Sequence, residues 1–377
     1  MNNDSQLTKL PFSVKTAFYI TAFLVLFVFA ISEAKGLLIP ITYSILISFI
    51  LYPMCKFFEN KGIPRIFSII LCFLIVLAGL FGIFYFFSTQ IVDIIKEFDD
   101  FRGKLLGLVH KGVEKYNQIV PNSKLDDESL LKKLQDWLNS SSGSILSGTF
   151  NQTANFFSGL LILPIYVFLL LLYRTGIRKV LMRFVDNEYR VAFMHLMTNV
   201  QQVGQKYIGG LVLLILIIGL LDSIALMIIG IDSPFFFGYL AACLAIIPYV
   251  GTAAGAVLPA FYALINYDAT TAFYVILAFW LVQVLDGNFL TPKIIGGGVS
   301  LNPLAAILAL IAGSAVWGVS GMILFIPLAA ILKIVCQNYK ELEPFAGLMG
   351  DEITEGDEIR TAKKHDTKTP FWKKLFR

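Results

Sequence analysis

Long apolar runs separated by short charged stretches make up most of this 377-residue chain. The first two runs, residues 16–32 and 37–54, flank a short polar turn, and a third run covers residues 66–88. Segments of about 20 apolar residues are long enough to cross the ~30 Å hydrocarbon core of a bilayer as helices. The pattern therefore predicts three transmembrane spans in residues 1–88, with the first two paired as a helical hairpin.

The pattern changes between residues 89 and 152, where eight Lys or Arg residues accompany nine Asp or Glu residues. Apolar positions recur every three to five residues from Ile91 to Val113, which predicts an amphipathic helix. A second helix is expected to begin at Asp126 or Asp127, because either side chain can cap free backbone N–H groups. We interpret residues 89–152 as a small helical region outside the membrane.

A fourth apolar span, residues 154–173, ends in a basic cluster formed by Arg174, Arg178, Lys179 and Arg183. Lys and Arg beside membrane spans are enriched on the cytoplasmic side. Together with the basic residues between 56 and 65, this cluster places residues 174–183 in the cytoplasm and residues 89–152 outside. A polar cytoplasmic helix is expected within residues 174–206.

A fifth apolar run, residues 207–231, contains a single carboxylate, Asp222. A charged side chain at that depth costs about 2.5–3.5 kcal/mol on insertion, so Asp222 is expected to face the bundle interior or a partner. Two interpretations stay open. Asp222 either belongs to a membrane pathway or has a structural role, protonated or bonded to a neighbouring Ser or to the backbone.

Two later apolar segments, residues 234–265 and 303–335, are interrupted by Gly and Pro. Proline inside a helix removes a hydrogen bond and costs about 3 kcal/mol. The interruptions follow a similar order, with Pro234, Gly251 and Pro259 in the first segment and Pro303, Gly321 and Pro327 in the second. Paired interrupted segments are typical of the binding regions of transporters. Each segment is expected to form either a kinked span or a re-entrant hairpin.

A seventh span, residues 270–290, runs into a polar stretch and the glycine cluster at 296–298. We interpret this stretch as a polar, non-helical break beside a membrane pathway, and the alternative is a helix end followed by a loop. Lys293 is expected to neutralise Asp286 if the chain folds back at Pro292. The candidate pathway residues are Asp222, Pro248, Gly251, Gly255, Gln283, Asp286, Asn288, Pro292, Lys293, Pro303, Gly321 and Pro327.

Composition excludes a soluble protein, because 57% of the residues are hydrophobic and only 15% are charged, against about 25% charged in soluble domains. We therefore predict an all-α polytopic membrane protein of about eight transmembrane helices. The net charge of +4 is dispersed beside apolar spans, which does not favour nucleic-acid binding. No CxxC, Walker or HExxH motif and no catalytic Ser/His/Asp order occurs, so neither an enzyme, a metal site nor a cofactor is expected.

The chain is divided by these patterns into four regions. Residues 1–88 hold three spans, 89–152 form the extracytoplasmic region, 153–336 form a transmembrane core with the linker 174–206, and 337–377 form a charged tail. The tail ends in aromatic and basic residues, which suit contact with anionic headgroups of the inner leaflet.

Two motifs carry a resemblance to a known family. The first is Ile247-Pro248-Tyr249-Val250-Gly251, and the second runs from Asp286-Gly287-Asn288 through Thr291-Pro292-Lys293 and Leu301-Asn302-Pro303 to Pro327-Leu328-Ala329-Ala330. With this order and spacing, the chain resembles the bacterial autoinducer-2 exporter family of membrane transporters. It departs from the family pattern at Asp286, where Glu is usual, and at Asn302, where His is frequent.

The resemblance implies a bacterial inner-membrane transporter, with both termini cytoplasmic, that assembles as a homo-oligomer. Family members are associated with export of a furanosyl quorum-sensing molecule, and some with sodium/proton antiport. Three hypotheses follow: a secondary exporter of a small polar solute such as autoinducer-2, a monovalent cation/proton antiporter with Asp222 and Asp286 as exchanging carboxylates, and a non-transporting scaffold or regulator.

Overall fold

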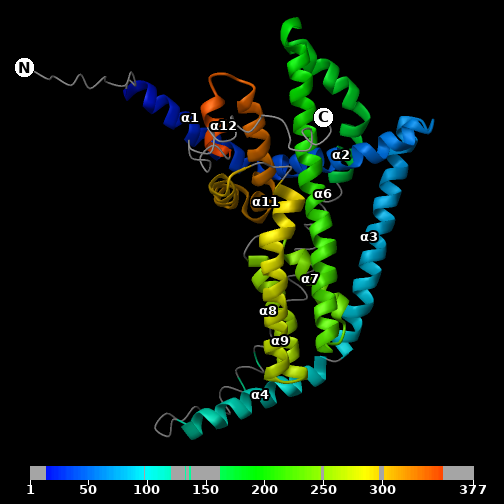
Figure 1. Ribbon diagram of the computed structural model, residues 1–377, viewed down its shortest axis with the longest axis vertical. Coiled ribbons are helices and arrows are strands. Elements are labelled where there is room, and N and C mark those ends of the chain that lie inside the picture. The colour runs from blue at the N-terminus through cyan, green and yellow to red at the C-terminus, as the bar shows by residue number, and fades with distance from the viewer. Residues whose placement is uncertain are drawn as a thin grey trace, which may run out of the picture.

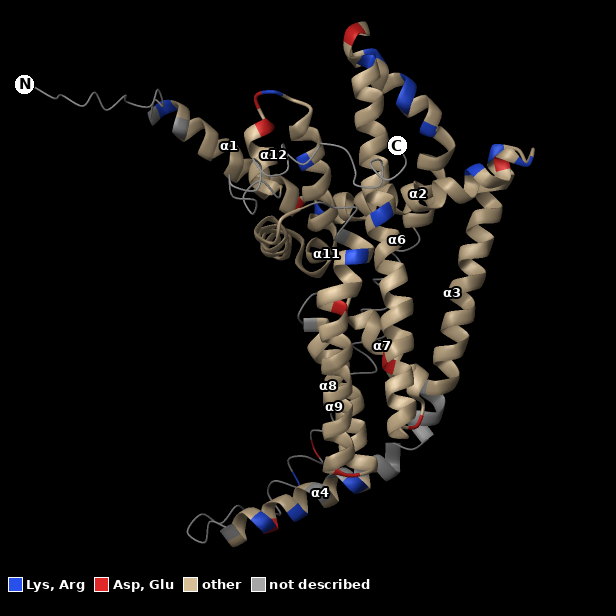
Figure 2. Cartoon of the chain, viewed as in Figure 1, with Lys and Arg blue, Asp and Glu red and all other residues tan. Residues whose placement is uncertain are grey.

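The all-α prediction is confirmed in the part of the chain that the structure describes. The computed structural model describes residues 14–96, 98–119, 132, 136, 162–247, 250–296 and 301–350, and their regular elements are all helices (Figure 1). Five of these helices are long and apolar enough to cross a membrane. Charged residues gather at the ends of the bundle and along α4, whereas long stretches of the upright helices carry none (Figure 2).

The expected hairpin at the N-terminus is wrong. Helices α1 (Val14–Glu33) and α2 (Lys35–Asn60) are joined by the single residue Ala34. The Ala34 N–H donates to Ala30 O and the Leu38 N–H donates to Ala34 O, so helical hydrogen bonding continues through the junction. The polar residues produce a bend, and α2 follows α1 instead of packing back along it (Figure 1).

The third span is longer than expected. Helix α3 covers Arg65–Lys96, and α4 (Phe98–Ile119) turns away across the far end of the bundle (Figure 1). The amphipathic helix expected from Ile91 to Val113 is therefore divided between these two elements. The helix expected from Asp126 or Asp127 lies outside the described residues, apart from 132 and 136.

The fourth span is described from residue 162 and remains helical to residue 181. Two short 3₁₀ turns, η1 (Met182–Phe184) and η2 (Asn187–Tyr189), lead into α6 (Arg190–Ile229). Helix α6 has 40 residues, which gives a length of about 60 Å. The expected cytoplasmic helix before Lys206 and the fifth span are thus one continuous helix that extends beyond the bilayer core. Gly230, in the left-handed conformation at φ 89°, ends it.

The segment at 234–265 forms a helical hairpin. Helices α7 (Pro234–Leu244) and α8 (Val250–Asn266) pack against each other in antiparallel directions. A Cβ on Gly251 would overlap the carbonyl oxygen of Leu244. Helix α7 has only 11 residues, about 16 Å of helix, which is too short to cross the bilayer core. The hairpin interpretation is therefore correct for this segment.

The segment at 303–335 is also a hairpin, within the element α11 (Pro303–Gln337). Gly318 has φ 61° and ψ −137°, which reverses the chain between two helical arms. Gly313 and Gly321 approach so closely that a Cβ on either would overlap the backbone of the other, although a straight helix would hold them about 12 Å apart. Trp317 at the tip donates to Ile31 O of α1 at 3.1 Å.

The two hairpins share the features that the sequence had suggested. Pro234 and Pro303 each occupy the first turn of the first arm. Pro259 and Pro327 each lie inside the second arm and are fully buried. Between the hairpins, α9 (Ala269–Leu285) begins at Asp268, which accepts the Thr271 N–H at 2.6 Å. This hydrogen bond holds the pKa of Asp268 below its ordinary value.

We expect Gly251→Ala and Gly321→Ala to destabilise the protein by about 1–3 kcal/mol each, because the added methyl group overlaps backbone atoms. The control is Gly79→Ala in α3, where a Cβ meets no atom within 4 Å and a gain of up to about 1 kcal/mol is expected. Thermal unfolding in detergent measures all three. Equal stability of the three variants would contradict the close packing of the hairpins.

Candidate functional site

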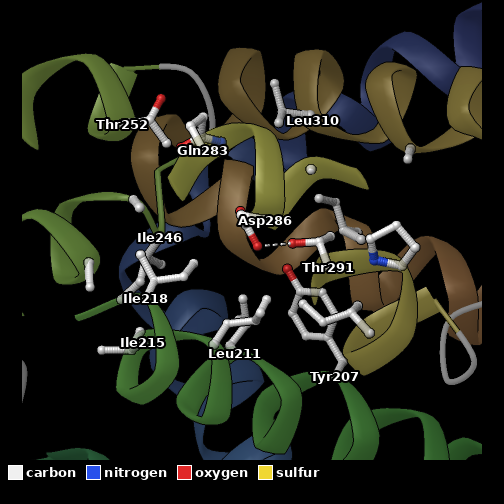
Figure 3. A pocket seen from close by; sticks show the side chains of 18 of the residues that line it. Tyr207, Leu211, Ile215, Ile218, Ile246, Thr252, Gln283, Asp286, Thr291 and Leu310 are labelled. Atoms are coloured by element: carbon white, nitrogen blue, oxygen red, sulfur yellow. Dashed lines mark hydrogen bonds between the residues drawn. The ribbon is translucent and has the colours of Figure 1, made fainter. Parts of the chain in front are cut away.

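A cavity of about 640 Å³ lies where α6, the α7–α8 turn, the end of α9 and the first arm of α11 meet (Figure 3). Its walls are mainly aliphatic, with a small group of polar side chains among them. The polar lining residues are Tyr207, Thr252, Gln283, Asp286 and Thr291. Cavities of roughly 300–1,000 Å³ with few polar groups are typical of sites for small ligands.

The polar side of the cavity is built on a widened helix. After Leu285 the chain forms two π-helical turns, η3 (Asp286–Leu290) and η4 (Pro292–Gly296). In an α-helix, positions 286 and 291 would point about 140° apart, whereas i→i+5 winding stacks them on one face. The Thr291 hydroxyl accordingly donates to Asp286 Oδ1 at 2.8 Å (Figure 3).

The expectation of a non-helical break is therefore wrong for residues 286–296. The same polar residues are helical, but wound in a rare form that is often found at functional sites. Lys293 is exposed, and the carboxyl group of Asp286 bonds to Thr291 instead of pairing with that lysine. Of the glycine cluster, Gly297 and Gly298 lie outside the described residues.

The opposite wall is a face of α6. Leu211, Ile215 and Ile218 present aliphatic side chains toward the polar group (Figure 3). Tyr207 donates its hydroxyl to Ile323 O in the second arm of α11 at 3.1 Å. This bond joins α6 to the α11 hairpin at the edge of the cavity.

The structure brings four of the candidate residues together at this cavity: Gln283, Asp286, Pro292 and Pro303. Three others, Gly251, Gly255 and Gly321, lie at the close contacts within the hairpins. Pro327 is buried inside the second arm of α11. Asn288 is exposed and donates to Val284 O at 2.8 Å, while Pro248 lies outside the described residues.

Asp222 is buried in α6, as expected, with 3% of its surface exposed. Its Oδ1 has no hydrogen-bond partner among the residues that the structure describes. The adjacent Ser223 donates its hydroxyl to Gly219 O at 2.6 Å and not to Asp222. Asp222 is not a lining residue of the cavity.

Sequence reasoning missed three polar lining residues, Tyr207, Thr252 and Thr291. Thr252 directly follows the Ile247–Gly251 motif, and Thr291 opens Thr291-Pro292-Lys293, so both had a signal in the sequence. Tyr207 had none, because it stands at the start of an ordinary apolar run. Within the described ranges, no group of three His, Cys, Asp or Glu side chains is arranged to hold a metal ion.

A clasp fixes the entrance of the first arm of α11. The Asn302 side chain accepts the Ala305 N–H as an N-cap. It also donates to Leu348 O, in the last turn of helix α12 (Glu343–Met349), and to Gly350 O, directly after that helix. Asn302 is 2% exposed. Helix α12 is therefore held beside Pro303, which lines the cavity.

Comparison with known proteins gives a consistent result. The pattern of the family described as "AI-2E family transporter" matches residues 19–341. The "Putative transport protein YrrI" of Bacillus subtilis is 25% identical over 312 residues, 81% of this chain and 87% of the relative. The "AI-2 transport protein TqsA" of Escherichia coli is 21% identical over 336 residues, 87% of this chain and 93% of the relative.

Replacing Asn302 separates its capping role from its clasping role. Asn302→Asp keeps the N-cap acceptor but loses the donor to α12, and Asn302→Ala loses both. We expect each change to destabilise the packing of α12 by about 2–4 kcal/mol, since one buried and one part-buried carbonyl group lose their partner. Limited proteolysis at residues 338–350 measures the release of α12.

The matched control is Asn338→Ala, which removes an exposed amide that bonds only within its own helix. It should leave the proteolysis rate unchanged. Protection of α12 in Asn302→Asp equal to that in the parent protein would show that the cap, and not the clasp, is the role of this residue.

Proposed function

Because the chain belongs to the AI-2E family of transporters, we propose that it is a secondary transporter that exports a small polar solute. The Asp286–Thr291 pair in the cavity carries this proposal. A carboxylate among aliphatic walls is energetically costly in a membrane protein. Such a residue is therefore expected to have a function. In this reading the solute occupies the cavity and bonds to Asp286.

The chemistry of the cavity supports a hydroxylated solute. Asp286 accepts hydrogen bonds, while Thr252, Thr291 and Gln283 are each able to donate and to accept. An autoinducer-2-like furanosyl molecule offers several hydroxyl groups to such a set, and the name of the TqsA relative gives this class a precedent. The aliphatic walls would exclude water from these bonds and so strengthen them.

The hairpins support a transport mechanism. Ala245 and Ile246 in the α7–α8 turn and Pro303 at the start of α11 all line the cavity, so both interrupted segments border the proposed binding site. Chain reversals within the membrane are tolerated where protein or an aqueous cavity surrounds them. We further propose an inner-membrane location, cytoplasmic termini and a homo-oligomeric assembly.

One observation favours a second activity, monovalent cation/proton antiport. Asp222 is buried, and its Oδ1 has no hydrogen-bond partner among the described residues. In this second activity, protons and sodium ions would compete for the carboxyl groups of Asp222 and Asp286. The solute hypothesis remains first because Asp222 does not line the cavity.

Replacing Asp286 tests the solute site. We expect Asp286→Asn to lower the initial rate of solute export from vesicles about ten- to hundredfold. A hydrogen bond to a charged group contributes about 1.5–3 kcal/mol, and its loss corresponds to a factor of this size. Asp286→Glu should retain most of the activity because it keeps the charge. If shape alone matters, Asn will be tolerated better than Glu.

The control for that experiment is Asp268→Asn, which makes the same change at an exposed N-cap outside the cavity. Asn caps a helix as well as Asp, so the rate should not change. Normal export by Asp286→Asn at equal protein levels would remove the cavity from the proposed mechanism.

A sodium gradient separates the two proposed activities. Vesicles that contain the protein and a pH dye, but no organic solute, should show no sodium-driven pH change. A sodium-driven change that disappears in Asp222→Asn, while Asp232→Asn in the α6–α7 loop has no effect, would instead identify an antiporter.

A further inference from the structure

A second cavity, of about 570 Å³, lies near the opposite end of α6. It is enclosed by α2, the helix at residues 162–181, the first turns of α6 and the second arm of α11. None of its lining residues borders the first cavity. The charged members of its lining are Arg174 and Arg178, which belong to the basic cluster of the sequence.

The basic side of this cavity has an excess of positive charge. Arg174 pairs with Glu59 and holds its guanidinium 4.8 Å from the ring centroid of Tyr52. Arg65 donates to Thr175 Oγ1 at 3.0 Å and lies 3.9 Å from the same Glu59. Glu59 is thus shared between two guanidinium groups.

Arg178 has no carboxylate partner among the described residues. Its Nη2 contacts Met194 Sδ at 3.3 Å, and sulfur is a weak acceptor. Arg174 Nη1 is also buried without a hydrogen-bond partner in the described part of the chain. The cluster therefore has unused hydrogen-bond donors and a net charge of about +2, since it contains three guanidinium groups and one carboxylate.

Most of the remaining lining of the cavity is apolar, with a few uncharged polar side chains such as Ser48, Thr198 and Gln201. Phe49, Leu171, Ile331 and Val335 line it, and an inorganic anion would leave most of this surface uncovered. Figure 2 shows that Lys and Arg gather at this end of the bundle, where α2 and α3 join and where α6 begins. A ligand with an anionic head and an apolar chain matches both parts of the cavity.

We propose that this cavity binds one anionic phospholipid from the leaflet at the basic end of the bundle. The phosphate lies between Arg174 and Arg178, and an acyl chain lies along Phe49 and Ile331. Basic pockets between membrane helices recognise such headgroups, which are concentrated in the cytoplasmic leaflet. The two cavities share no lining residue, so the lipid site does not depend on which solute is transported.

Native mass spectrometry of the full chain in neutral detergent tests this site. The protein is titrated with phosphatidylglycerol and, separately, with phosphatidylcholine of the same chain length. We expect one phosphatidylglycerol to bind at least about tenfold more tightly than phosphatidylcholine, given two arginines near the phosphate. Excess inorganic phosphate should not displace the lipid.

Arg178→Gln should weaken phosphatidylglycerol binding about fivefold, the effect of one basic contact near a membrane surface. Lys179→Gln is the matched control, because it removes the same charge from the next residue of the helix without changing the cavity lining. Thr198→Trp places a bulky side chain at an exposed lining position and should also block the lipid. It leaves every arginine in place.

Three results would overturn the proposal. Equal losses in Arg178→Gln and Lys179→Gln would indicate general surface charge. Equal affinity for the two lipids would show that the cavity does not select for the net negative charge of the lipid. Displacement by inorganic phosphate at concentrations similar to those of the lipid would indicate a site for free phosphate.

Discussion

Close backbone packing at glycine is the constraint on which the rest of this structure depends. A chain that reverses inside a membrane exposes N–H and C=O groups that lipid cannot satisfy. In both hairpins the arms approach until no side chain fits between them, at Gly251 against Leu244 and at Gly321 against Gly313. The turns can then be covered by neighbouring helices, and the α7–α8 turn becomes a wall of the first cavity.

The π-helical turns extend the same logic to the polar site. Winding that bonds each residue to the one five positions further along places Asp286 and Thr291 on one face. One oxygen of the carboxyl group thereby accepts a hydrogen bond from the chain itself. A solute that displaced this bond would bind less tightly and leave more readily, which suits a transporter better than a tight receptor.

The sequence predicted the helical class, most spans and the region of the site, because apolar run length and Gly/Pro interruptions report directly on helices in lipid. It failed at Ala34, where polar residues suggested a reversal but the backbone stays helical. It also failed at residues 286–296, because π-winding depends on the packing around the helix and leaves no period in the sequence. Asn302 showed its departure from the family pattern in the sequence, but its clasp on α12 required the fold.

Helix α6 forms a wall of both cavities, through Tyr207 to Ile218 in one and through Phe193 to Gln201 in the other. Leu196 and Tyr207 are separated by about 16 Å along its axis. Pivoting this helix by 10° would shift one wall relative to the other by about 3 Å over that distance. Because both walls belong to one helix, a ligand that fixes the angle of α6 at one cavity also restricts the position of the α6 wall at the other cavity.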